Sequence, residues 1–480
     1  MDRNHPDGEG ALDPALEAAG TLSPDAGSRL ALPWRPLFIS LGAMGAILLL
    51  GWLDLPMVNR DMNSVLLGVS HEIRGHFPLL RLGLGPVVSG FLLVELAALV
   101  VPAWREWRLN GPGGRARLRT AALLVGLGMA ALQSFSLVQL MKANRFIGHD
   151  TLTLLATWMA LMAGVWILLA LMRVIDRHGL GSGFSVVLLG LLASEAQRAA
   201  VKNHLFFRGT PTRLMVLTLL VVLLSLAFRR EAGGTGRPAR RMDLPFPACG
   251  LQPYFLPLLA LTLLTALRLG FRAFSMPQVR DPFAVLAGRL NDTVFLGVAL
   301  LVSVPLFTLL FNWPGHVADA WNRRHAGQEE AHLREAWRAV ARSMVQSAGF
   351  LIGLLALRGL LLRERDPMDL VSLVLLMAIA TDLVREWGFR IQHGALASAW
   401  PLHRVHALGP ALETLQEAGI PAFARGLHHR SLLQFFGPMV PVDLLVPETR
   451  VEEASGLLHE LLVPVGSASA EEGEPVPTGE

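Results

Sequence analysis

Two histidines near position 70 come closest to a catalytic motif. His71 and His76 flank Glu72, and zinc proteases also place a glutamate beside the first of two helical histidines. That chemistry requires histidines four residues apart, so that both lie on one helical face. Here they are five apart with Gly75 between them. We therefore predict no metal site at this stretch.

The other candidates for chemistry are also incomplete. Residues 111–115 (GPGGR) lack the lysine and the serine or threonine of a phosphate-binding loop. Cys249 is the single cysteine, which excludes an internal disulfide framework and a thiolate metal cluster. No nucleophile stands beside a recognisable base. Histidines near the C-terminus lack ordered spacing, and we interpret them as surface residues: His403, His406, His428, His429 and His459. The sequence thus predicts no catalytic, cofactor-binding or metal-binding residues.

The composition places most of the chain in lipid. Of the 480 residues, 52% are hydrophobic and 17% are charged, whereas a soluble domain carries about 25% charged residues. A helix needs about 20 apolar residues to cross a membrane, and lipid favours helices because it cannot satisfy an open backbone. Ten spans are expected: Leu37–Leu53, Leu84–Val101, Thr120–Leu140, Thr151–Met172, Phe184–Ala199, Arg213–Ala227, Pro253–Leu269, Val294–Phe311, Met344–Leu362 and Asp369–Val384.

Basic residues predict the orientation of these spans. Arginines gather in the loops after the second, sixth and eighth spans, which all face one side if the count is ten. Cytosolic loops carry the excess of Lys and Arg, so that side is the cytosol and both termini are cytosolic. Residues 1–33 are polar and acidic, unlike a signal peptide, and we predict a disordered cytosolic tail.

Six stretches resemble the motifs of one protein family and occur in the same order along the chain. Arg173–Gly190, RVIDRHGLGSGFSVVLLG, is similar to an E-x-G-I-G-N-G-I-S pattern of the SecY family of protein-conducting channels. Arg177, Ser182 and Phe184 replace three residues of that pattern. The other five stretches that resemble SecY segments are Arg81–Leu96, Arg105–Arg117, Leu244–Leu256, Leu310–Trp321 and Ser372–Asp382.

The resemblance implies an all-α membrane protein of ten helices in two pseudo-symmetric halves of five. It also implies an apolar ring that closes the pore, at Val88, Leu92, Phe184, Leu188, Phe255 and Leu375. Such residues in membrane helices otherwise serve packing or face lipid. Glu95 stands where the family has glutamine; it is either a polar gate residue or a helix-end glutamate that reaches the interface.

The resemblance also implies partners. These are the lipid bilayer, small SecE-like and SecG-like subunits, a translocating polypeptide, and SecA or a ribosome, but no nucleic acid. The cytosolic docking loops would carry Arg229, Arg230, Arg237, Arg240, Arg241, Arg323 and Arg324. The first of these loops is shorter than in the family, and the second lacks its G-x-R-P-G turn. The expected location is the bacterial inner membrane.

The composition changes after Gln392. Strands are expected at Leu402–Ala407, Ile420–Arg425 and Pro441–Pro447, with helices at Leu408–Ala418 and Val451–Leu462. This order suggests a small α+β, ferredoxin-like half, and its motifs resemble a small family of prokaryotic signal-transducing domains. The chain then divides into a tail (1–33), a channel domain (34–394), a cytosolic module (395–466) and an acidic disordered tail (467–480).

These features favour a divergent SecY-like translocase subunit without chemistry of its own. Two alternatives remain at this point. The first is a regulatory membrane protein that keeps the fold, does not translocate, and signals through the C-terminal module. The second is a small-solute transporter, which would need buried charges at the midplane; the only candidates are Glu95, Glu195 and Arg198.

Overall fold

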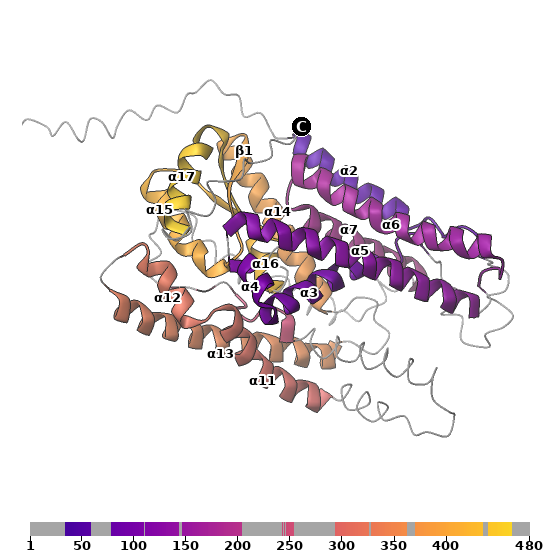
Figure 1. The fold of residues 1–480 in the computed structure, drawn as a ribbon, viewed down its shortest axis with the longest axis horizontal. Helices are drawn as coiled ribbons and strands as arrows, with labels where there is room; N and C mark the ends of the chain where they lie inside the picture. The colour runs from indigo at the N-terminus through magenta and orange to yellow at the C-terminus, as the bar shows by residue number, and fades with distance from the viewer. Residues whose placement is uncertain are drawn as a thin grey trace, which may run out of the picture.

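The computed structural model describes residues 34–58, 78–109, 111–143, 146–203, 242, 244, 246–253, 293–325, 328–361, 370–434 and 440–462. Long helices form one elongated body, and the C-terminal module lies at one end of it (Figure 1). The long helices are α2 (Trp34–Leu50), α3 (Gly85–Val100), α5 (Gly111–Ala143), α6 (Thr151–His178), α7 (Gly183–Asn203), α11 (Thr293–Phe311), α13 (Glu329–Leu361) and α14 (Leu370–His393).

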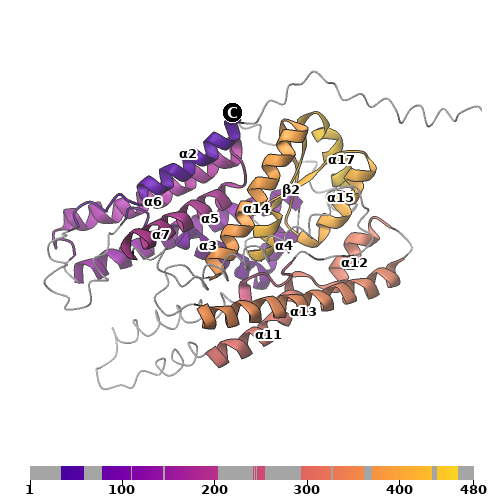
Figure 2. The same ribbon diagram turned by 180° about the vertical axis from the view of Figure 1, so that it is seen from behind.

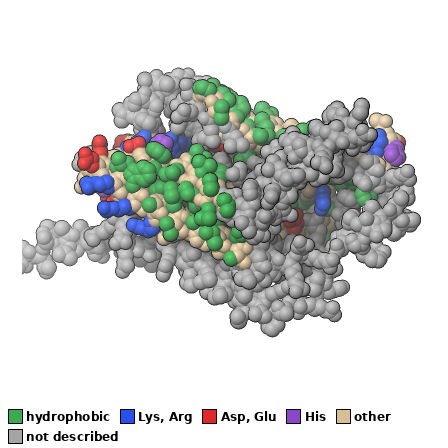
Figure 3. Space-filling view, turned by 90° about the horizontal axis from the view of Figure 1, so that it is seen from below, with side chains coloured by type: hydrophobic (Ala, Val, Ile, Leu, Met, Phe, Trp, Pro, Cys, Tyr) green, Lys and Arg blue, Asp and Glu red, His purple; other side chains and the backbone are tan. Residues whose placement is uncertain are grey.

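Eight of the ten expected spans coincide with these helices. The spans expected at 213–227 and, beyond Pro253, at 254–269 lie outside the described residues. Four described stretches are long and apolar enough to cross a membrane, namely Gly114–Gln139, Thr151–His178, Leu301–Asn322 and Glu329–Ala356. Figure 3 shows a broad apolar surface over α11 and α13, with charged side chains gathered where α13 begins. An exposed apolar surface of this kind is what lipid contact requires.

One stretch expected as a cytosolic loop is helical instead. After the eighth span, α12 (Pro314–Asn322) forms, and α13 begins at Glu329 rather than at Met344. The prediction of a loop was wrong because apolar side chains lie among the arginines at helical spacing. Val317 and Trp321 of α12 form one apolar cluster with Ala336 and Ala339 of α13. Packing of this amphipathic face stabilises the helix beyond the expected apolar span.

Small residues allow the first helices to approach each other closely. A side chain at Gly90 of α3 would place its Cβ atom 2.3 Å from the backbone nitrogen of Gly126 in α5. Helices in a membrane associate mainly through close packing, because the hydrophobic effect does not favour helix–helix contact over contact with lipid tails. Small residues make such close packing possible. A short helix, α4 (Pro102–Leu109), joins the two.

The C-terminal module contains a three-stranded antiparallel sheet in the order β1-β3-β2. Its elements are β1 (Leu396–Leu402), a 3₁₀ turn (Val405–Ala407), α15 (Leu408–Glu417), β2 (Phe423–Arg425), α16 (Leu427–Leu432), β3 (Val442–Pro447), a 3₁₀ turn (Glu448–Arg450) and α17 (Val451–Leu462). Since β3 is antiparallel to both neighbours, β1 and β2 are parallel and form a split β-α-β unit. The ferredoxin-like identity of the module stays a prediction.

One expectation for the module was wrong, and one helix was missed. The first strand lies at 396–402, because pairing with β3 sets its position and the chain then enters a 3₁₀ turn at 405–407. The helix α16 was not expected. The helix at 451–462 lies where the sequence predicted it.

The helix α14 belongs to both parts of the molecule. Its first turns join the apolar core of the long helices through Val374 and Ala378. Near its end, the Phe389 ring stacks on Phe423 of β2 at a centroid distance of 5.5 Å. Figure 2 shows α14 running beside β2, with α15 and α17 on the module's outer side. The module is therefore attached through a continuous helix rather than a flexible linker.

Candidate functional site at the junction of α14, α16 and the α6–α7 turn

The α6–α7 turn, residues 179–182, is tightly defined by glycines and backbone contacts. Gly181 has φ +81°, a left-handed conformation that glycine adopts without steric cost. A side chain at Gly183 would place its Cβ atom 2.1 Å from the Met172 carbonyl oxygen, so only glycine fits. The Gly183 N–H donates to the Asp176 carboxylate at 2.6 Å. The sequence stretch that most resembles a family motif thus forms a rigid turn.

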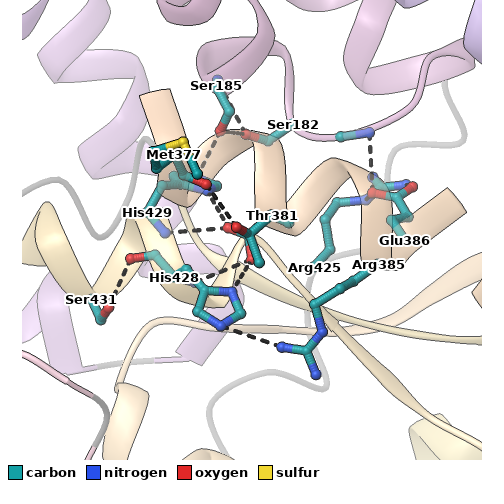
Figure 4. A network of polar contacts seen from close by, with 12 residues as sticks. Ser182, Ser185, Met377, Thr381, Arg385, Glu386, Arg425, His428, His429 and Ser431 are labelled. Atoms are coloured by element: carbon teal, nitrogen blue, oxygen red, sulfur yellow. Dashed lines mark hydrogen bonds and ion pairs between the residues drawn. The ribbon is translucent and has the colours of Figure 1, made fainter. Parts of the chain in front are cut away.

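A stripe of charged residues on α14 faces this turn. Asp382, Glu386 and Arg390 are spaced four residues apart and therefore share one helical face. Glu386 is 1% exposed and accepts a hydrogen bond of 3.0 Å from the Gly181 backbone N–H. It also accepts two hydrogen bonds from Arg390 and two from Arg425 of β2, at 2.9–3.1 Å. Glu386 therefore connects the turn, α14 and the module (Figure 4).

Asp382 binds the two histidines of α16. The Nδ1 atom of His429 lies 2.9 Å from Asp382 Oδ2, and that of His428 lies 2.5 Å from Oδ1. The backbone N–H groups of both histidines also donate to this carboxylate. On its other side, His429 Nε2 lies 2.7 Å from Ser185 Oγ of α7. We call Ser185, Asp382, Glu386, Arg425, His428 and His429 the junction network.

The order Ser185–His429–Asp382 reproduces the connectivity of a serine hydrolase triad. The surroundings do not suit that chemistry. Ser185 is 2% exposed, and the Ser182 hydroxyl oxygen occupies a position 2.5 Å from its Oγ atom. A substrate carbonyl has no approach to this hydroxyl. We therefore interpret the three residues as structural hydrogen-bonding groups that hold α16 against α7 and α14.

The end of α16 contacts residues 246–253, another stretch with family resemblance. The Leu251 N–H donates to the Leu432 carbonyl at 2.8 Å, and Ser431 Oγ donates to the Phe246 carbonyl at 3.0 Å. The Ala248 carbonyl accepts from Gln434 at 2.9 Å and from Asn312, next to α11, at 2.8 Å. The α16 segment is thus hydrogen-bonded to α7 and α14 through His429 and to residues 246–253 through its end.

Asp443 of β3 lies among the charges of the junction. Burial, together with the nearby carboxylates of Asp176 and Glu386, raises the pKa of Asp443 to about 6, although Arg425 and Arg119 oppose the shift. The ionised form of Asp443 is therefore disfavoured where the module meets the long helices.

Five of the six predicted pore-ring residues lie within the described chain. Phe184 and Leu375 are buried members of the main apolar cluster. Val88, Leu92 and Leu188 are partly buried and pack against that cluster. Phe255 lies outside the described residues. The structure thus brings side chains from α3, α7 and α14 into a single apolar cluster.

The other predicted residues have mixed outcomes. Glu95 is buried within α3, at 4% exposure. Arg323 donates to the Leu462 carbonyl of α17 at 3.1 Å, and Arg324 forms an ion pair with Glu417 of α15. The module therefore contacts this predicted docking segment directly. The docking arginines at 229–241 and the 71–76 stretch lie outside the described residues.

The interpretation of all C-terminal histidines as surface residues was wrong for three of them. His428 and His429 are 1% exposed, and His406 is 8% exposed. Burial, with Arg404 and His316 nearby, lowers the pKa of His406 to about 3, so this side chain is neutral. A signal was present in the sequence. His428 and His429 stand between Leu427 and the apolar pair Leu432 and Leu433, which is unusual for a solvated surface.

Comparison with known proteins gives the following similarities. The SecY family model matches residues 78–230. Protein translocase subunit SecY of Bacillus subtilis is 26% identical over 206 residues, which are 38% of this chain and 46% of that protein. The same subunit of Staphylococcus aureus is 24% identical over 157 residues, 31% of this chain and 36% of that protein. The chain thus spans less than half the length of these relatives.

Among solved structures, "The structure of a protein conducting channel" aligns with a TM-score of 0.49 and 14% identity. The alignment covers 76% of this chain and 94% of that chain. A likeness of this size carries no argument about function.

Proposed function

Because the chain carries a SecY-family domain over residues 78–230, we propose that it is a SecY-like channel that conducts polypeptides across or into a membrane. We assign the channel to residues 34–394, as ten helices in two halves, with a cytosolic module at 395–466. The tails, 1–33 and 467–480, belong to neither. No chemical step is assigned to the chain.

The shared apolar cluster is the observation that carries this proposal. Side chains from three helices that are far apart in sequence, including Leu92, Phe184 and Leu375, belong to it. An apolar constriction excludes water and ions at rest and can still yield to a passing chain. Val88, Leu188 and Phe255 complete the proposed ring. Glu95 lies one turn from Leu92 on α3, where its carboxyl group would act as a polar gate residue.

The proposed partners follow from the same assignment. They are the lipid bilayer of a bacterial inner membrane, SecE-like and SecG-like subunits, and the translocating polypeptide. A SecA motor or a ribosome would dock on the basic cytosolic segments. Since Arg323 and Arg324 contact the module, such a partner would meet the module at the same place.

The test is the ion conductance of the purified chain in planar bilayers. Serine at Leu92 or Leu188 makes the constriction polar, so water enters it and the resting leak rises. Leu93→Ser is the matched control, because Leu93 is 48% exposed on the same helix and faces away from the apolar cluster. We expect increased conductance for Leu92→Ser and Leu188→Ser only.

Either of two outcomes would refute the proposal. One is an unchanged conductance for both ring variants in protein that is inserted and folded. The other is an equal increase for Leu93→Ser, which would show general damage to the helix rather than an opened constriction.

A further inference from the structure

The helix α16 is part of the module in sequence but part of the long-helix core in space. Leu432 and Leu433, at and just after its end, belong to the main apolar cluster, together with Phe184 and Leu251. Most other apolar residues of the module form a separate core that includes Leu444 of β3. Leu427, at the start of α16, packs against this separate core, whereas the end of α16 belongs to the main cluster.

The position of α16 joins helices that belong to different halves of the proposed channel. Ser185 lies in α7, the fifth expected span, whereas Asp382 lies in α14, the tenth. His429 contacts both side chains. Leu432 is also bonded to Leu251, two residues before the seventh expected span. Movement of one half relative to the other would break at least one of these contacts.

The attachment of α16 permits such a movement. The helix has six residues, so few of its backbone groups are bonded within the helix itself. It begins after Gly426, which has φ +77° and connects it directly to β2. A short helix that follows a glycine can rotate about that glycine while the sheet stays intact.

We propose that α16 is a built-in gate that covers the module side of the channel and must leave its site before a polypeptide can reach the pore ring. The proposal rests on the proposed channel function. His429 of α16 binds Ser185, which directly follows the ring residue Phe184, so a chain that arrives at Phe184 from the module side displaces α16. The junction network holds the gate closed.

The native cysteine provides the test. Cys249 is the only cysteine of the chain, is fully buried, and lies in the segment that contacts α16. Burial raises the pKa of its thiol to about 12, so the unreactive thiol predominates in the closed state. On either side of Cys249, Ala248 and Leu251 are hydrogen-bonded to Gln434 and Leu432, so we expect release of α16 to expose this thiol. The rate of labelling by a maleimide therefore measures gate opening in the full-length chain, without any added probe.

The test compares variants of the junction network with matched controls. Ser185→Ala removes the buried hydrogen bond to His429, and His429→Ala removes that bond and the one to Asp382. We expect the labelling rate to rise by about tenfold to a hundredfold. Ser398→Ala and His459→Ala, at exposed positions of the module, should label at the rate of the unchanged chain. Ser185→Ala removes a single hydroxyl oxygen and remains informative if His429→Ala fails to fold. Circular dichroism and full labelling in denaturant verify each sample.

Conductance in planar bilayers then separates the possible outcomes. Faster labelling of the Ser185 and His429 variants with higher conductance supports the gate. Unchanged labelling in both folded variants overturns it, because α16 is then a fixed part of the core. Faster labelling without added conductance also overturns it, provided that Leu92→Ser conducts. If neither Leu92→Ser nor Leu188→Ser conducts, the proposed function fails, and the gate fails with it.

Discussion

Removal of the Glu386 carboxylate should detach the module from the α6–α7 turn. In Glu386→Ala, Arg425 and Arg390 lose a buried anionic acceptor and the Gly181 N–H loses its partner. Removing one partner of a buried ion pair costs about 3–5 kcal/mol, because the remaining charge stays buried and unpaired. Since 1.4 kcal/mol is a factor of ten, docking should weaken by about two to three and a half orders of magnitude.

Hydrogen–deuterium exchange in detergent or nanodiscs measures this effect. Peptides that cover the α6–α7 turn, β2 and α16 should lose protection together, while peptides within α6 retain theirs. Glu386→Gln keeps the shape and one acceptor oxygen, and its loss of protection should be smaller. Glu453→Ala is the control, because its ion pair with Arg450 is exposed and worth less than about 1 kcal/mol.

The reasoning would be refuted if Glu386→Ala and Glu453→Ala exchanged alike at the turn and at β2. It would also be refuted if only α14 lost protection, since Glu386 would then stabilise its own helix and not the contact with the module.

Two further predictions concern the α6–α7 turn and the pH dependence of docking. Gly183→Ala places a methyl group against the backbone carbonyl of Met172, so we expect lower thermal stability and faster hydrogen exchange at the turn. Gly85→Ala is the control, because the space around Gly85 is open and this variant should behave like the unchanged chain. The pKa of Asp443 is raised in the docked state, so its contribution to docking is complete below its ordinary value near 4 and is lost as the pH rises through about 6. Docking of the module, measured by hydrogen exchange, should therefore be about tenfold stronger at pH 5 than at pH 7.5. Asp443→Asn should abolish this difference. If the pH dependence persists in Asp443→Asn, it comes from another titratable group and the prediction fails.

The long helices could be predicted because lipid imposes a simple rule on them. Each crossing needs a continuous apolar run, so α6 and α11 begin within a residue of the expected positions. The helix ends beyond the lipid were less predictable. In α13, tertiary packing against α12 extends the helix by four turns into a basic stretch, and hydropathy carries no signal for that packing.

The junction network could not be predicted in the same way. Ser185 and His429 are separated by 244 positions, and each is an ordinary polar residue in its local context. Asp382 aligns with the acidic residue of a family motif, but nothing in the sequence predicted its hydrogen bonds to His428 and His429. The six-residue helix α16 is too short to produce a periodic pattern. Contacts of this kind follow from the three-dimensional arrangement of the chain and not from local spacing.

The continuity of α14 places a constraint on how this protein can change in length. One residue added between Val384 and Glu386 would rotate everything beyond it by about 100° and advance it by about 1.5 Å. Glu386 would then point away from Gly181, and Phe389 away from Phe423. An insertion of about seven residues, close to two full turns, is the shortest that nearly restores the angular phase, and it would still shift the module by about 10 Å along the helix axis. A module joined in this way is fixed in both angle and height, so grafting it onto another helical protein requires the whole of α14.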